Sequence, residues 1–213
     1  MFDRKSLEVY VLLAATFVGA LVTANLISSK IVTIGGLVVP AGVLAYSITF
    51  AVTDTVCEIW GRRATQALVN AGFVVLLLVW ALVSLAVAVP AAPFWDNQQA
   101  YAGVLGSAPR IILASLAAYA VSQTLDVFQF QWLKERFGGR HLWLRNNAST
   151  LVSQTVDATV FVTLAFYGEY PILPIIAGQL VVKYVIALVD TPIVYALVYL
   201  VRLRVPPEPA PAA

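Results

Sequence analysis

The sequence predicts an all-α, polytopic membrane protein with six transmembrane helices and both termini on the cytoplasmic side. Hydrophobic residues make up 61% of the 213 residues and charged residues only 11%, and the mean hydropathy is +0.86. Soluble domains do not have such a composition. Six apolar segments each approach the length of about 20 residues that a membrane-spanning helix needs. Lys and Arg gather in the connections of one side, which predicts the orientation.

The predicted spans follow one another with short connections. The first apolar run, residues 9–29, carries no charge. It is longer than the apolar core of a signal peptide, so we expect it to be retained as a span. The Pro-rich segment 90–109 is predicted to be an aqueous loop. The six expected spans are residues 7–28, 37–60, 66–89, 109–130, 147–168 and 172–201.

Turn residues and charges mark the other connections. We expect a single six-helix domain over residues 1–205, followed by a disordered Pro/Ala-rich tail over 206–213. The predicted connections are a Gly-Gly turn at 35–36, a basic turn at 61–63, a basic loop at 134–145 and a short turn at 168.

The positive charges are distributed unequally between the two sides of the predicted membrane domain. Only Lys30 and Arg110 lie on the side opposite the termini, and Lys183 lies inside the sixth span. The positive-inside rule therefore predicts that both termini are cytoplasmic. We expect a multi-pass protein of the inner or plasma membrane, with the lipid bilayer as its environment and with a homodimer left open. No basic patch interleaved with aromatics is present, so we expect no nucleic-acid partner. The ten cations on the terminal side are Arg4, Lys5, Arg62, Arg63, Lys134, Arg136, Arg140, Arg145, Arg202 and Arg204.

A short polar sequence occurs twice inside apolar segments. VSQTLD spans residues 121–126, and VSQTVD spans 152–157. In each copy Ser, Gln and Asp share one helix face, because they are three or four residues apart. An acid within a membrane span indicates a functional site, and two such faces on consecutive spans can make one site. The alternative is that these residues only hydrogen-bond neighbouring helices together.

Four aspartates are predicted at similar depth in the membrane. A helix rises about 1.5 Å per residue, which puts two of them about 12 Å and two about 18 Å from the nearest cytoplasmic cation. The middle of a hydrocarbon core is about 15 Å in, and transporters bind substrate there. The four aspartates are Asp54, Asp126, Asp157 and Asp190.

Polar neighbours of these aspartates extend the candidate substrate site. Glu58 follows Asp54 by four residues and precedes Arg62 by four, so we expect Glu58 to pair with Arg62 in addition to any ligand contact. Gln179 and Lys183 share a stripe on the sixth span. The predicted substrate-binding residues are Asp54, Glu58, Gln123, Asp126, Gln154, Asp157, Gln179 and Lys183.

The sixth span contains both the deep lysine and a candidate coupling residue. Lys183 and Asp190 are about 10 Å apart along a straight helix, too far for direct contact. We therefore expect Lys183 to balance an aspartate on another span. Pro192 removes a backbone donor just after Asp190, and Asp190 is the candidate for energy coupling.

The predicted site is acidic on formal count. It suits a cationic ligand, a ligand rich in N–H donors, or a proton relay. Planar ligands would find aromatic rings for stacking among Trp60, Phe128, Phe130, Phe161, Phe166 and Tyr184.

These segments, in this order, resemble the queuosine-precursor transporter family, also known as the vitamin-uptake-transporter group. The resemblance covers roughly residues 8–202. The matching pieces are FAVTDTVCEIWGRRAT (50–65), with the family's aspartate-x-x-x-glutamate-x-x-glycine block, QTLDVFQFQWLK (123–134), RNNASTLVSQTVDATVF (145–161), and Lys183 followed by Pro192.

The resemblance implies uptake, by six helices, of 7-cyano-7-deazaguanine and 7-aminomethyl-7-deazaguanine, the free-base precursors used in tRNA modification. A deazaguanine offers a ring N–H and an amino group that a carboxylate can accept, and a carbonyl to which Gln or Lys can donate. The sequence alone does not distinguish this base from another planar amine.

Two other functional classes compete with a solitary transporter. One is an intramembrane aspartyl enzyme with two carboxylates that share a proton, but the Gly-x-Gly-Asp signature of such proteases is absent. The other is a substrate-binding subunit that docks an energising partner. The only histidine, His141, lies in a basic loop, where a catalytic or metal-binding role is not expected. We expect no enzymatic activity, no cofactor and no metal site. The single cysteine, Cys57, is expected to be a small buried hydrophobe.

Overall fold

The computed structural model describes the backbone of residues 4–136 and 142–204. Within these ranges it does not describe the side chains of residues 123, 124, 126–136, 142–151, 187, 188, 190 and 191. The predicted tail and His141 lie outside the described residues. The elements are α1 (Arg4–Ile27), β1 (Ile31–Ile34), β2 (Leu37–Pro40), α2 (Gly42–Ala88), α3 (Gln98–Leu105), α4 (Ala108–Arg136), α5 (Leu142–Phe166) and α6 (Ile172–Arg204).

Helix α2 contains two of the predicted spans. Its 47 residues would extend about 70 Å as one straight helix, more than twice the hydrocarbon core of about 30 Å. Gly61 breaks it with φ 78° and ψ 176°, a conformation that only glycine adopts without strain. The basic turn predicted at residues 61–63 is therefore confirmed, with Gly61 as its cause.

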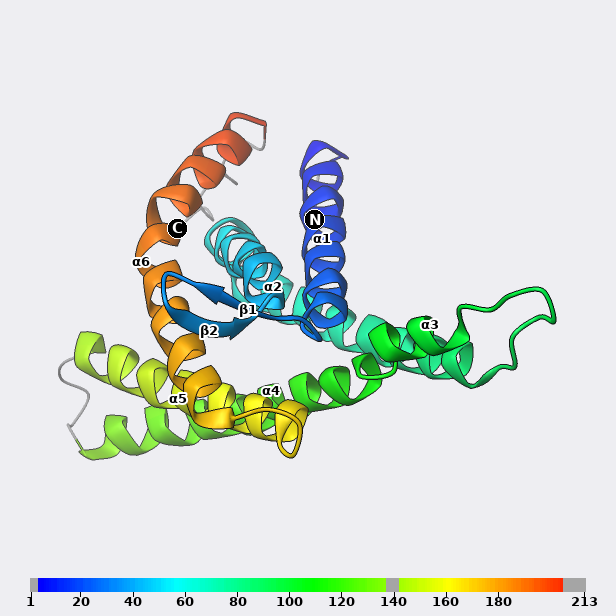
Figure 1. Cartoon of the computed structure of the whole chain (residues 1–213). Helices are drawn as coiled ribbons and strands as arrows, with labels where there is room; N and C mark the ends of the chain where they lie inside the picture. The colour runs from blue at the N-terminus through cyan, green and yellow to red at the C-terminus, as the bar shows by residue number, and fades with distance from the viewer. Residues whose placement is uncertain (1–3, 137–141, 205–213) are drawn as a thin grey trace.

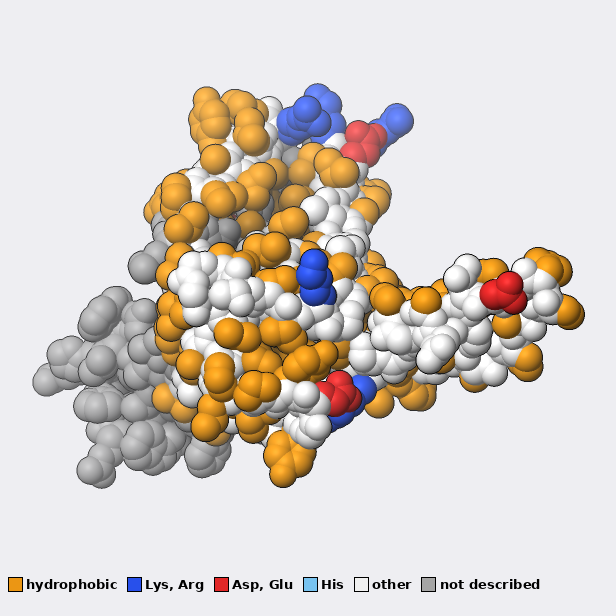
Figure 2. Space-filling model, in the orientation of Figure 1, with side chains coloured by type: hydrophobic (Ala, Val, Ile, Leu, Met, Phe, Trp, Pro, Cys, Tyr) orange, Lys and Arg blue, Asp and Glu red, His pale blue; other side chains and the backbone are white. Residues whose placement is uncertain are grey.

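The predicted fold class is confirmed. Among the described residues three helical stretches are long and apolar enough to cross a membrane, and two shorter apolar helices cover Val152–Phe166 and Ile172–Ile186. Figure 2 shows a face that is mostly hydrophobic, with charged side chains in a few small groups. Exposed apolar side chains on membrane-spanning helices are what a surrounding lipid phase requires. The three long stretches are Arg4–Ile27, Gly42–Ala88 and Gln98–Ser122.

The boundary predicted at residue 37 is wrong, because a β-hairpin precedes the second span. β1 pairs antiparallel with β2, with Ile34 opposite Leu37. Gly35 and Gly36 form the turn with φ 56° and 83°, as Gly-Gly hairpin turns do. Average hydropathy cannot separate a short apolar strand from a helix, and only the β-branched residues of β1 indicated a strand. Helix α3 likewise lies inside the predicted aqueous loop 90–109.

The start of α1 and the Gly61 turn within α2 lie together at one end of the molecule. Trp60 Nε1 donates to Ser6 Oγ at 2.8 Å, and the Tyr10 hydroxyl donates to the Ala64 carbonyl at 3.0 Å. These bonds hold the Gly61 turn beside the start of α1. Both described chain ends lie at this side of the molecule in Figure 1.

The end of α6 joins the same group. Arg202 Nη2 contacts Glu58 Oε1 at 2.9 Å. We call the start of α1, the Gly61 turn and the end of α6 the basic end. Its cations belong to three of the four groups that the charge count placed on one side. The side chains of the fourth group, within residues 134–145, lie outside the described part.

The hairpin lies toward the opposite end. Ile31 and Val38 pack against a buried cluster that includes Ile111 of α4, Phe166 of α5 and Ile175 of α6. We call this the hairpin end. In Figure 1 the hairpin crosses in front of α2 beside α6, whereas α3 and the loop before it project away from the other helices.

Candidate functional site

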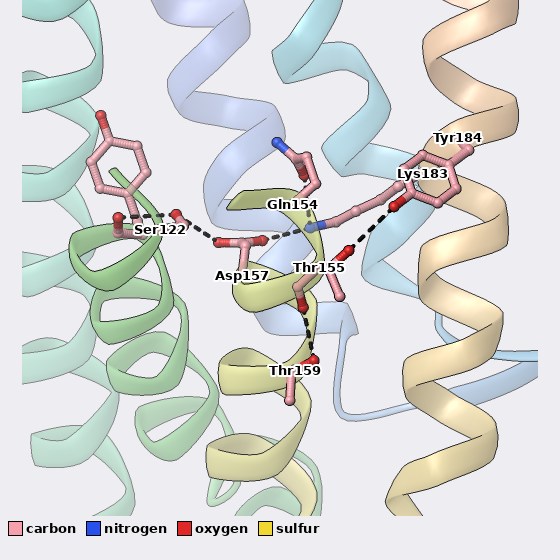
Figure 3. A network of polar contacts seen from close by, with 8 residues as sticks. Ser122, Gln154, Thr155, Asp157, Thr159, Lys183 and Tyr184 are labelled. Atoms are coloured by element: carbon pink, nitrogen blue, oxygen red, sulfur yellow. Dashed lines mark hydrogen bonds and ion pairs between the residues drawn. The ribbon is translucent and has the colours of Figure 1, made fainter. Parts of the chain in front are cut away.

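A buried ion pair joins α5 and α6. Lys183 Nζ lies 2.5 Å from Asp157 Oδ2, and the two side chains are only 5% and 18% exposed. Lys183 also donates to Gln154 Oε1 at 3.3 Å, and Figure 3 shows both contacts. A buried charge needs such a partner, because desolvation penalises it strongly. The prediction that Lys183 balances an aspartate on another span is confirmed.

The two copies of the repeated sequence meet at this ion pair. Ser122, in the first copy on α4, donates to Asp157 Oδ1 of the second copy at 3.4 Å. The same hydroxyl also donates to the Tyr119 carbonyl at 3.1 Å. Asp157 therefore contacts both α4 and α6, as Figure 3 shows. Such a network can serve only to hold the helices together. A role in ligand binding also requires a cavity beside it.

A cavity adjoins the ion pair. Its volume is about 510 Å³, counted with its open mouth. We call it the Asp157 cavity. Five helices and strand β2 contribute to it. Its lining consists of Ala24, Asn25, Ser28, Pro40, Gly42, Val43, Tyr46, Ser115, Ala118, Asp157, Phe161, Gln179 and Lys183.

Gln179, which lines this cavity, has an acceptor without a partner among the described residues. The residue is only 8% exposed, and its Oε1 is buried without a hydrogen-bond partner among the described residues. A buried polar atom left unsatisfied costs about 1–3 kcal/mol. An N–H of a ligand in the Asp157 cavity would supply the missing donor. The residue before it, Gly178, must be glycine, because a Cβ there would lie 2.2 Å from the Val38 carbonyl oxygen of β2.

Two aromatic rings line the cavity, and the sequence pointed to only one of them. Phe161 was among the predicted stacking rings, whereas Tyr46 was not. Tyr184 instead contacts Thr155 at 3.3 Å, Trp60 lies at the basic end, and Phe166 packs in the core. The predicted rings Phe128 and Phe130 have side chains outside the described residues.

Asn25 is a second lining residue that the sequence analysis missed. Its Nδ2 donates to the Leu21 carbonyl at 2.9 Å, within α1. An asparagine in an otherwise apolar span was a usable signal. Tyr46 gave no such signal, because aromatic residues are common in membrane helices.

The remaining predicted site residues do not gather in the Asp157 cavity. Asp54 lines a second cavity. Glu58 pairs with Arg202 and not with Arg62 as expected, because the break at Gly61 removes the helical spacing of four residues. The side chains of the predicted residues Gln123, Asp126 and Asp190 lie outside the described part.

Cys57 corrects one further expectation. It is exposed and lines the second cavity, so the prediction of a small buried hydrophobe is wrong. Its apolar neighbours in sequence misled the prediction, because they face other helices or lipid. The thiol is consequently accessible to reagents that enter this cavity.

Comparison with known proteins identifies the family. Residues 40–197 match the family described as "Putative vitamin uptake transporter". The chain belongs to this family. A protein of Bacillus subtilis (strain 168) named "Probable queuosine precursor transporter" is 35% identical over 181 residues, which are 83% of this chain and 79% of the relative. The Escherichia coli (strain K12) "Queuosine precursor transporter" is 29% identical over 126 residues, 59% of this chain and 54% of that protein. No solved structure matches the chain.

The family match covers most of the Asp157 cavity. It begins at Pro40 of the hairpin and ends within α6, so it includes Tyr46, Asp157, Gln179 and Lys183. The residues that α1 contributes to the cavity lie before the matched segment. The family resemblance predicted from the sequence is thus confirmed over the segments that form the site.

Proposed function

We propose that this chain is an inner- or plasma-membrane transporter for queuosine precursors, the free bases 7-cyano-7-deazaguanine and 7-aminomethyl-7-deazaguanine. Two relatives carry names of this substrate class. The observation that carries the proposal is that Lys183 and Gln179, whose buried Oε1 has no hydrogen-bond partner among the described residues, line the same cavity. An acceptor next to a donor complements the ring N–H and the neighbouring carbonyl of a deazaguanine.

The donors and acceptors in the cavity can be assigned. An ammonium has three N–H donors, and Lys183 uses two of them, on Asp157 and Gln154. The third donor is available for the ring carbonyl of the base, while Gln179 Oε1 accepts the ring N–H. Asp157, already contacted by Lys183 and Ser122, retains lone pairs for the exocyclic amino group.

This assignment adds a second role to the one expected for the aspartate. From the sequence, a carboxylate was expected to bind the base directly, with Lys183 as its counter-ion. In the structure Asp157 orients and neutralises Lys183, and Gln179 offers the open acceptor. Tyr46 and Phe161 supply ring surfaces to a planar ligand, and the cationic 7-aminomethyl form would find its counter-charge in Asp157.

The base is expected to cross the membrane unchanged. The described ion-pair partner of Asp157 is a lysine, which does not form the proton-sharing carboxylate pair of an aspartyl enzyme. The domain that carries the transport is the predicted six-helix unit over residues 1–205.

Complementation tests the substrate assignment. A cell that cannot make queuosine precursors should regain modified tRNA at low external precursor when it expresses this chain. Gln179→Leu should restore little, whereas Glu8→Gln, which alters only an exposed pair with Arg4, should restore as much as the unmodified chain. No modified tRNA despite membrane expression of the unmodified chain would exclude this substrate.

A further inference from the structure

A second cavity lies between α1, both halves of α2 and α4. Its volume is about 1,080 Å³, again counted with its mouth. It contains Asp54, which the sequence analysis had placed with the other substrate residues, and Arg62, which had been assigned to Glu58. The proposed Asp157 cavity leaves both side chains without a role.

The two cavities lie one behind the other between the two ends of the molecule. The second cavity is lined by Arg62 and Gln66, directly after the Gly61 turn at the basic end. The Asp157 cavity is lined by Ser28 and Pro40, which flank the hairpin. A ligand that crosses from the hairpin end to the basic end therefore meets both.

Two residues line both cavities and so form the boundary between them. They are Tyr46 on α2 and Ser115 on α4. The Tyr46 ring packs edge-on against Phe50, with ring centroids 5.2 Å apart. Passage between the two cavities therefore requires the Tyr46 side chain to move.

The second cavity repeats the chemistry of the first. Each contains one acid, one cation, at least one amide and aromatic rings. In the second cavity these are Asp54, Arg62 and Gln66, with the Tyr119 and Phe73 rings 4.5 Å apart. Asp54 can accept N–H groups, and Arg62 can donate to a ring carbonyl. A purely structural cavity between apolar helices would not need this set.

We propose that the second cavity is a separate binding site for the same deazaguanine-type base, occupied after the base passes Tyr46. We call it the inner site. The inference rests on the proposed function, because it takes the same ligand. Its position at the basic end makes it the last binding site before release on that side.

Cys57 allows a direct test, because it lines the inner site and is the only cysteine of the chain. The experiment measures the rate at which a charged methanethiosulfonate reagent modifies Cys57 in the purified full chain, with and without 7-cyano-7-deazaguanine. If the base occupies the inner site, its presence at ten times its Kd should slow the reaction about tenfold. Equilibrium binding of the base is measured in parallel.

Two sets of variants distinguish the sites. Asp157→Asn should weaken binding to the Asp157 cavity yet retain base-dependent protection of Cys57. The double variant Asp54→Asn/Gln66→Leu should lose protection while base binding persists. As a control, Cys57→Ala/Val104→Cys moves the thiol to exposed α3, where the base should not change the rate.

The outcomes separate this inference from the proposed function. Base binding without any protection of Cys57 would overturn the inner site and leave the function intact. Protection that disappears in Asp157→Asn and persists in Asp54→Asn/Gln66→Leu would also overturn it, since the base then acts from the first cavity alone. Failure of the unmodified chain to bind the base would remove the proposed function and the inner site together.

Discussion

The Lys183 ammonium is the charge on which the candidate site depends. It sits between Asp157 and Gln154 of α5, and its side chain is 5% exposed. The sequence predicted that Lys183 would pair with another span, because the acid on its own helix lay too far along it. Which of the other aspartates would pair with it was not predictable, since spacing along a helix does not reveal how neighbouring helices rotate.

Removing this cation should destabilise the fold. Lys183→Met leaves Asp157 buried without its partner, and breaking a buried pair in this way costs about 3–5 kcal/mol. Thermal unfolding in detergent should show a large fall in midpoint. Glu58→Gln is the matched control, because it breaks a pair that is 57% and 58% exposed and should cost at most about 1 kcal/mol. Similar losses for the two variants would contradict a buried, functionally charged site.

Substitution of Gln179, unlike that of Lys183, should weaken base binding without lowering stability. Gln179→Leu removes a buried carbonyl that has no partner among the described residues, so the stability of the ligand-free protein should stay level or rise. The base loses its acceptor and keeps an unpaired N–H, which costs about 1–3 kcal/mol, or roughly 5 to 150-fold in Kd. Unfolding midpoints and base binding are measured on the same preparations. A lower midpoint with unchanged Kd would instead assign Gln179 to interhelical hydrogen bonding.

Among the elements, α2 was predicted almost completely and the hairpin was missed. Gly61 with its two arginines marked the break in α2, because glycine punctuates helices and cations stay out of the hydrocarbon core. The residues of β2 are as apolar as a helix end, so hydropathy assigned them to the second span. The hairpin packs closely against α6, because Gly178 has no side chain and leaves room for the backbone of Val38.

The turn that divides α2 should tolerate only glycine. No atom lies within 4 Å of a Cβ placed at Gly61, so space is not limiting, but φ there is 78°. Gly61→Ala should therefore cost about 1–3 kcal/mol of backbone strain, measured as a lower unfolding midpoint. At Gly19, also with open space around a Cβ but within α1, alanine should be neutral or stabilising by up to about 1 kcal/mol. A harmless Gly61→Ala would mean that α2 does not turn at this residue.

At the scale of the whole molecule, two polar cavities lie between the hairpin end and the basic end. The contacts of Trp60, Tyr10 and Arg202 gather the start of α1, the Gly61 turn and the end of α6 on one side, in agreement with three of the four groups in the predicted distribution of Lys and Arg. The common depth of the aspartates was a weaker guide. Asp157 and Asp54 line different cavities, because depth counted along each helix says nothing about the direction in which its side chains point.

Energy coupling is a property of the whole molecule, and the sequence contains no Walker motif for ATP hydrolysis. Asp157 is engaged by Lys183 and Ser122, so we assign proton coupling to Asp190, which precedes the helix-internal Pro192 of α6. Uptake of neutral 7-cyano-7-deazaguanine into proteoliposomes should then follow an imposed pH gradient. One pH unit is worth about 1.4 kcal/mol, or roughly tenfold accumulation for one proton per base. Asp190→Asn should abolish this response and spare binding, whereas equal uptake by the unmodified protein with and without the gradient would indicate facilitated diffusion followed by metabolic trapping.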